Sequence, residues 1–190
     1  SSVAVVFSAP VRNRSNDVDY GYHQDPDFYY LTGFTDPDAI LFLYKDSVNA
    51  KRRARLLVHP RDPKQERWTG RMAAVEDAQR ISGISDVSVV ADGSLFDVPL
   101  TSLRKMLTKR QSQGVVNDRT DEYDLYDLLQ HYHRETDSSG VNTDDYLLGK
   151  ILARLRSVKS AEELVHLQRA IDISVQGHLA MMKDVRPGMH

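Results

Sequence analysis

The chain has 190 residues, 41% of them hydrophobic, which is enough for one domain or for one domain with a fragment of another. Its 25 Lys and Arg residues nearly balance 27 Asp and Glu residues, which argues against nucleic-acid binding and against a long acidic tail. The chain lacks cysteine, so disulfides, thiolate metal sites and a cysteine nucleophile are excluded, and a cytoplasmic location is expected.

Short apolar, β-branched or aromatic runs predict strands in the first part of the chain. These runs are Val3–Phe7, Phe28–Leu31, Ala39–Tyr44, Ala54–His59, Val87–Ala91 and Gly114–Asn117. Ala39–Tyr44 is continuously apolar, which is typical of a central strand that is buried on both faces. Val3–Phe7 is too short to span a bilayer and is interpreted as a strand, so no membrane partner is expected.

Helical patterns lie between and after these runs. They cover Ala73–Ile81, Leu95–Thr108, Asp121–Arg134 and Asp144–Leu155. Because strands alternate with helices, we expect an α/β fold with a mixed sheet of about six strands flanked by helices, over about Ser1–Arg156.

The last part of the chain predicts one long amphipathic helix. Ser160-Ala161-Glu162-Glu163 forms a capping box, and Pro187-Gly188 ends the helix after about 26 residues, or roughly 39 Å. Its apolar stripe is formed by Leu164, Leu167, Ile171, Val175, Leu179 and Met182. A stripe of this width needs a covering surface, so we expect a piece of a larger protein, with the stripe covered by a further domain or by a second copy.

Sequence motifs for catalysis and metal binding are not found. His131 and His133 point about 200° apart on a helix and would chelate a metal poorly. His-Glu-x-x-His, a glycine-rich phosphate loop and a serine nucleophile elbow are all missing from the sequence. Paired carboxylates are numerous, but most lie where turns and helix caps explain them.

Aromatic residues gather in Asp17–Phe34 and predict a contact surface. Six of them fall in this tract, interleaved with polar groups: Tyr20, Tyr22, Phe28, Tyr29, Tyr30 and Phe34. Such mixtures are typical of interfaces, although a strand with one aromatic face in the core is an equal alternative. Trp68, the only tryptophan, lies among charged residues and is either a contact residue or a lid over the core.

The sequence resembles the N-terminal domain of aminopeptidase P, a family of metallopeptidases related to creatinase and prolidase. The resemblance lies in Tyr20–Phe34 with Asp36-Pro37-Asp38-Ala39, in Pro60-Arg61-Asp62-Pro63, and in Glu66-Arg67-Trp68-Thr69-Gly70-Arg71. Leu155–Glu163 and Arg186-Pro187-Gly188-Met189 resemble the junction into that family's catalytic domain and its first helix. Nearly the whole chain is covered, with Ser82–Tyr146 contributing little.

The resemblance implies a two-domain enzyme that removes the N-terminal residue of a peptide when proline comes second. Its pita-bread catalytic domain holds two divalent metal ions, usually manganese. No metal ligand or catalytic residue of the family matches a position in this chain. Residues 1–156 would form the N-terminal domain, and residues 157–190 the linker and first helix of the catalytic domain.

What the resemblance does imply for this chain is an auxiliary role. In oligomeric relatives the N-terminal domain helps to assemble subunits and narrows the mouth of a neighbour's active site. We therefore expect a homo-oligomer that acts on proline-containing peptides and binds no nucleic acid. Trp68 is the best candidate contact, and the other candidates are Tyr22, Gln24, Phe28, Tyr30 and Arg71.

Two alternative functions are considered, and one residue differs from the pattern of the family. The same domain occurs in prolidases, which cleave dipeptides, and a stand-alone binding module without peptidase activity is a third reading. His23 stands where the family often has arginine. An imidazole cannot replace the fork of donors of a guanidinium group, so a salt bridge of the family at this position is not carried over to this chain.

Overall fold

The computed structural model describes residues 2–9, 11, 13–16, 18–45, 52–64, 66–90, 105–108, 142–144, 146–186 and 188. The chain divides into two compact units, Ser1–Lys150 and Ile151–His190. The predicted strand at Gly114–Asn117 and the predicted helix at Asp121–Arg134 lie outside the described residues.

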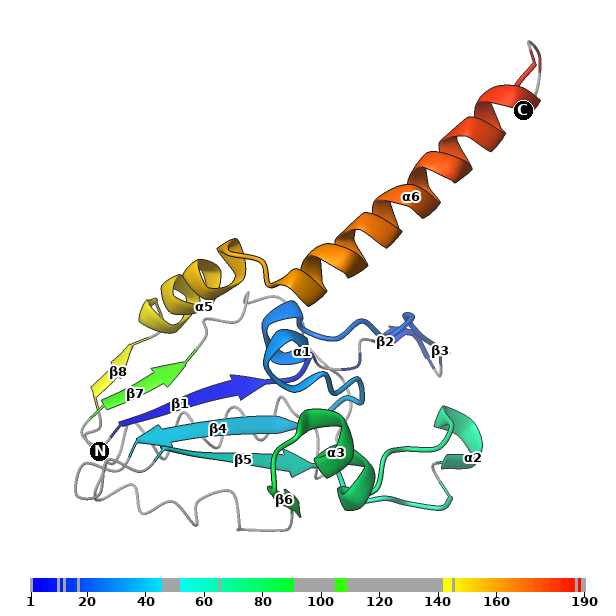
Figure 1. Cartoon of the computed structure of the whole chain (residues 1–190). Helices are drawn as coiled ribbons and strands as arrows, with labels where there is room; N and C mark the ends of the chain where they lie inside the picture. The colour runs from blue at the N-terminus through cyan, green and yellow to red at the C-terminus, as the bar shows by residue number, and fades with distance from the viewer. Residues whose placement is uncertain are drawn as a thin grey trace. The chain divides into compact units, whose positions relative to one another are not determined.

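Six described strands of the first unit form one mixed sheet, shown in Figure 1. The sheet contains β1 (Ser2–Phe7), β4 (Ile40–Lys45), β5 (Arg52–Val58), β6 (Asp86–Val89), β7 (Lys105–Thr108) and β8 (Asn142–Asp144), in the order β6-β5-β4-β1-β7-β8. The β1–β4 and β4–β5 pairs are antiparallel, whereas β5–β6, β1–β7 and β7–β8 are parallel. The prediction of a mixed α/β sheet with flanking helices is confirmed.

The central strands are covered on both faces. Val5 and Val6 are adjacent and so point to opposite faces of β1, yet both are 0% exposed. Ile40 and Leu41 on β4 are likewise fully enclosed. This agrees with the continuous apolar run that predicted a central strand.

The aromatic run Phe28–Leu31 is helical, so the strand prediction there is wrong. Helix α1 (Pro26–Thr32) begins with proline, and Asp25 Oδ1 accepts hydrogen bonds from the amides of Asp27 and Phe28. Gly33, at φ 64°, ends the helix in the left-handed conformation. The aromatic composition suggested a strand, but the cap, the proline and the glycine are helix signals that prevail.

The C-terminal part of the predicted helix Leu95–Thr108 is a strand, which corrects that prediction. In β7, Met106 and Thr108 are buried while Lys105 and Leu107 are partly exposed, which is the two-residue period of a strand. The backbone groups of β7 form their hydrogen bonds with the central strand β1, so they do not need the hydrogen bonds of a helix.

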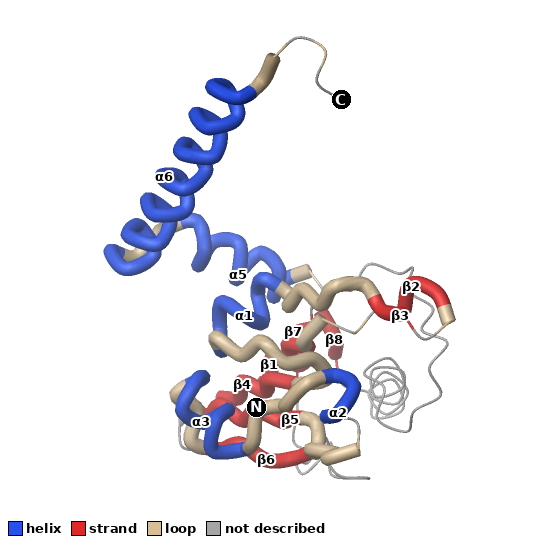
Figure 2. Tube along the Cα trace, turned by 90° about the vertical axis from the view of Figure 1, so that its right-hand side faces the viewer, coloured by secondary structure: helices blue, strands red, loops and turns tan. Residues whose placement is uncertain are grey.

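Two helices cover one face of the sheet. Helix α3 (Val75–Ser82) matches its prediction, and Gly83 at φ 69° ends it. It contacts β6 and α1, and α1 contacts β1. Figure 1 and Figure 2 show α1 and α3 on the same side of the sheet.

Short elements complete the first unit. Helix α2 (Glu66–Thr69) is a single turn, and the strands β2 (Asn13–Ser15) and β3 (Val18–Asp19) form a separate hairpin. The turn of this hairpin contains Asn16 at φ 48°, and the Arg14 guanidinium lies 5.9 Å from the centre of the Tyr20 ring.

Two helices end the chain. Helix α5 (Leu147–Ser157) begins later than predicted because Asp144 belongs to β8 and its Oδ1 accepts from the amides of Tyr146 and Leu147. Helix α6 (Ala161–Asp184) has the predicted capping box, in which Ser160 Oγ accepts from the Glu163 amide and Glu163 Oε2 accepts from the Ser160 amide.

Candidate functional site

Among the described residues of the sheet unit, Trp68 has the most exposed large apolar side chain. It lies on the single-turn helix α2, and 91% of its surface is exposed. An indole costs free energy when it is left in water, so an exposed tryptophan on a charged loop is typical of a contact residue. The alternative reading, a lid over the core, does not fit this exposure.

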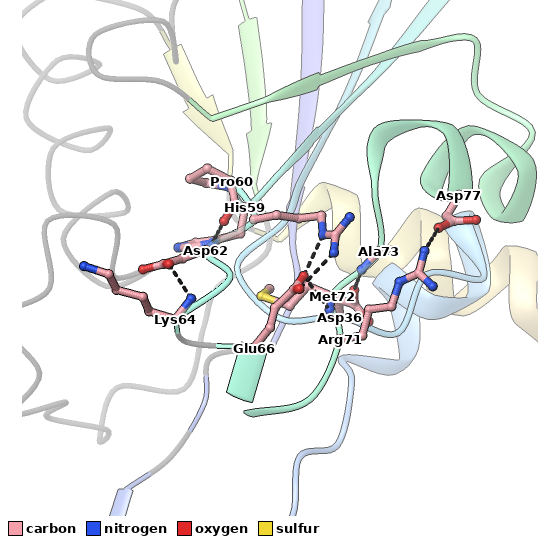
Figure 3. A network of polar contacts seen from close by, with 11 residues as sticks. Asp36, His59, Pro60, Asp62, Lys64, Glu66, Arg71, Met72, Ala73 and Asp77 are labelled. Atoms are coloured by element: carbon pink, nitrogen blue, oxygen red, sulfur yellow. Dashed lines mark hydrogen bonds and ion pairs between the residues drawn. The ribbon is translucent and has the colours of Figure 1, made fainter. Parts of the chain in front are cut away.

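The Glu66 side chain closes the loop that carries Trp68, because it contacts residues on both sides of the tryptophan. Arg61 Nε donates to Glu66 Oε1 at 2.6 Å and Arg61 Nη2 donates to Glu66 Oε2 at 2.8 Å, so the contact is bidentate (Figure 3). The Met72 amide also donates to Glu66 Oε1, at 3.3 Å. The Arg61 hydrogen bond holds the pKa of the Glu66 carboxyl below its usual range. The carboxylate is therefore ionised at neutral pH and joins the residues before and after Trp68.

A second contact ties this loop to the turn that follows α1. Asp36 Oδ2 accepts a hydrogen bond of 2.7 Å from the amide of Ala73, 37 residues away in sequence (Figure 3). On the other side of α2, Asp62 Oδ1 accepts from the Lys64 amide and the Asp62 carbonyl accepts from the Glu66 amide. Backbone amides on both sides of Trp68 are thus held by hydrogen bonds to Asp62 and Asp36.

The Gln24 side chain makes four hydrogen bonds within and next to the aromatic tract. Its Oε1 accepts from the amides of Ala9 and Asp25, both at 2.8 Å, and its Nε2 donates to the carbonyls of Phe34 at 3.3 Å and Asp36 at 3.0 Å. Amides only donate and carbonyls only accept, so these four partners fix the orientation of the side-chain amide. Through Asp36, Gln24 is linked to the loop that carries Trp68.

Tyr22 is half-buried beside Gln24. Its hydroxyl donates to the Ala9 carbonyl at 3.0 Å. Burial raises the pKa of the phenol well above its usual value, and a hydrogen bond with Ser8 opposes this shift only in part. Negative charge nearby raises the pKa further and comes from Asp38, Asp36 and Asp25. Tyr22 therefore stays neutral and serves as a hydrogen-bond donor.

The remaining candidates have different environments. Phe28 is 0% exposed, so its ring lies in the core and is enclosed within this chain. Tyr30 is partly exposed on α1. The Arg71 side chain is 75% exposed and lies 3.9 Å from Asp77, whose tighter partner is Arg80 at 2.8 Å. His23 is also exposed.

The structure thus brings Gln24 and the Trp68 loop into one network, whereas Phe28 is a buried residue of α1. Sequence reasoning missed the groups that make the connection, Asp36, Arg61 and Glu66. All three lie inside the motifs that carry the family resemblance, and this was the available signal.

The part of the chain that the structure describes holds no group of three or more His, Cys, Asp or Glu side chains able to bind a metal ion. The donor set of a dinuclear metal centre therefore does not fit the described residues. No described helix is long and apolar enough to cross a membrane.

Comparison with known sequences identifies the family. Residues 1–111 match the family described as aminopeptidase P, N-terminal domain. This match covers more than half of the chain, which therefore belongs to that family and bears out the resemblance seen in the sequence.

Similar proteins include Xaa-Pro aminopeptidases. One from Haemophilus influenzae is 31% identical over 191 residues, a match that covers 98% of this chain and 40% of the relative. The structure of proline aminopeptidase P II from Yersinia pestis matches with a TM-score of 0.72 at 29% identity, covering 99% of this chain and 42% of that one. A zinc-substituted aminopeptidase P of Escherichia coli in complex with product has a TM-score of 0.72 at 26% identity, with the same coverage of 99% and 42%. The chain spans about two fifths of the length of these proteins.

Proposed function

We propose that this chain is the non-catalytic N-terminal part of an Xaa-Pro aminopeptidase, which releases the N-terminal residue of a peptide when proline comes second. Membership of the family and the names of the similar proteins support this activity for the longer protein. The metal ions, two divalent cations and most simply manganese, would be held by residues beyond this chain, and the protein would act in the cytoplasm.

The proposed contribution of this chain to that activity is to assemble the subunits and to restrict access to the active site. We propose that it helps to form a homo-oligomer in which Trp68 reaches the mouth of a neighbouring subunit's active site. The observation that carries this proposal is the exposure of Trp68, 91%, on a loop that is held at both ends. A braced, exposed indole loses little conformational entropy when it binds, which favours a specific contact. Arg71, exposed on the same loop, would contribute to the same contact.

Helix α6 would serve the second domain. None of its 24 residues, all of which are described, is buried, and its stripe includes Leu164 at 52%, Leu167 at 48% and Ile171 at 47% exposure. We propose residues 1–156 as the N-terminal domain, and residues 157–190 as the linker and first helix of a pita-bread domain that covers this stripe.

The activity is tested with the chain and with the longer protein in parallel. The 190-residue chain, supplied with manganese, should release no N-terminal residue from a tripeptide with proline second, whereas the longer protein should release it. Turnover by the chain alone would contradict the non-catalytic role. Cleavage of Xaa-Pro dipeptides but not of the tripeptide by the longer protein would assign it to the prolidases instead.

A further inference from the structure

The helix that presents Trp68 is too short to hold its own orientation. Helix α2 contains four residues, and a single helical turn is unstable in water because few hydrogen bonds offset the ordering of its backbone. The direction of the indole must therefore be set by contacts on either side of the turn. The structure shows which contacts these are.

The Glu66 side chain contacts residues that come before and after helix α2. It is the first residue of α2, and its carboxylate binds Arg61, which comes before the helix, and the amide of Met72, which comes after it. Its side chain is only 14% exposed, although it lies on a surface loop. The Arg61 guanidinium and the Met72 amide thus both donate to this one carboxylate, and Figure 3 labels Glu66 and Met72.

The chain around Trp68 is thereby closed into a loop by one side chain. The bidentate geometry fixes the plane of the carboxylate as well as its distance from the guanidinium. The Met72 amide then fixes the backbone that leaves the loop, and the next residue, Ala73, is held by Asp36.

We propose that Glu66 is the positioning residue for Trp68: its carboxylate, clamped by Arg61 and capped by the Met72 amide, sets the direction in which the indole projects. The contact that the indole makes rests on the proposed function. The positioning itself is a property of this chain alone and is testable without any partner.

Trp68 is the only tryptophan, so its fluorescence reports on this loop without interference. Its indole is already exposed, so quenching and emission wavelength would change little, and the informative quantity is the time-resolved anisotropy. In Glu66→Ala, the amplitude of the fast, local anisotropy decay should rise roughly twofold, because the turn is released on the nanosecond scale. Glu66→Gln keeps an oxygen for the Met72 amide and should give a smaller rise.

Glu76→Ala is the matched control. Glu76 is an exposed acidic residue in the first turn of α3 and lies outside the clamp, so its removal should leave the Trp68 anisotropy unchanged. Far-UV circular dichroism should be the same in all variants. If Glu66→Ala fails to fold, Glu66→Gln and Arg61→Lys, which loses the fork but keeps the charge, carry the test.

Two outcomes would overturn the inference. One is an unchanged local anisotropy in the folded Glu66 and Arg61 variants, and the other is an equal change in Glu76→Ala. The assembly of the longer protein is measured separately with Trp68→Ala. If that assembly is unaffected while the Glu66 variants loosen the indole, the proposed function fails and the positioning role stands. The reverse result rejects the positioning role alone.

Discussion

Replacing Gln24 should separate its donor role from its acceptor role. Gln24→Glu keeps an oxygen for the amides of Ala9 and Asp25 but removes the N–H groups that bind the carbonyls of Phe34 and Asp36. Gln24→Ala removes all four hydrogen bonds. The pair of variants therefore measures the two halves of one side-chain amide.

The magnitudes follow from the number of bonds lost. A hydrogen bond contributes about 0.5–1.5 kcal/mol net, and a buried group left without a partner costs about 1–3 kcal/mol. Gln24→Glu should lower the free energy of unfolding by about 1–3 kcal/mol and Gln24→Ala by about 2–4 kcal/mol. These values allow for the partial burial of the hydrogen bonds that Gln24 makes. In Gln24→Glu the ionised carboxylate also faces two carbonyl oxygens, so the loss should shrink at low pH, where the protonated carboxyl donates again.

Urea unfolding followed by far-UV circular dichroism measures these free energies. Tryptophan fluorescence is unsuitable because Trp68 is exposed in the folded chain. Gln79→Glu is the control, since Gln79 Nε2 makes one exposed hydrogen bond, to the Ser85 carbonyl, and should cost less than about 0.5 kcal/mol. A Gln24→Glu variant as stable as the original chain, or no more affected than Gln79→Glu, would refute the central role of Gln24.

Three further substitutions test the surroundings of α1. Phe28→Ala should lower the free energy of unfolding by about 3–5 kcal/mol, because the ring is 0% exposed, whereas Tyr29→Ala, at 52% exposure, should cost far less; equal urea midpoints would be inconsistent with the buried position. Gly33→Ala should cost about 1–2 kcal/mol in the same assay, because its φ of 64° disfavours a Cβ although nearby atoms leave room for one; a neutral result would exclude the left-handed cap. Tyr22→Phe tests the raised pKa: the phenol contributes stability that is complete below the unfolded pKa, near 10, and is lost as the pH rises through the higher folded pKa. Tyr22→Phe should therefore lose less stability than the original chain when the pH is raised above 10, and equal losses would argue against this burial.

Strands β1, β4, β5 and β6 and the last helix could be predicted because their signals are local. The continuous apolar run of β4 and the capping box at Ser160 are each contained within a few residues. Local patterns predict elements well when the tertiary structure asks for the same conformation. This agreement holds for β1, β4, β5, β6 and α6.

The two wrong predictions of secondary structure have different physical causes. At Phe28–Leu31 the aromatic composition outweighed a proline, an aspartate cap and a glycine, which together specify a helix. At Lys105–Thr108 a pattern interpreted as helical was overridden by pairing with β1, and such pairing depends on residues about a hundred positions away.

The candidate contact residues could be predicted from the motifs, but the hydrogen bonds and the ion pair that hold them could not. Trp68 stands out in the sequence because it is a lone tryptophan among charges. The Asp36–Ala73 contact spans 37 residues and depends on how α1 packs, so the spacing of residue types could not reveal it. The Arg61–Glu66 ion pair is closer in sequence, but residue types alone do not show that Glu66 also accepts from the Met72 amide on the other side of Trp68.

The most direct test of the central proposal is Trp68→Ala in the longer protein, with solution mass and steady-state kinetics on a tripeptide with proline second. The account predicts weaker subunit association, or a changed KM for the peptide, with metal content unchanged and with the Tyr29→Ala control close to the original protein. Unchanged mass and unchanged KM and kcat in Trp68→Ala would contradict it.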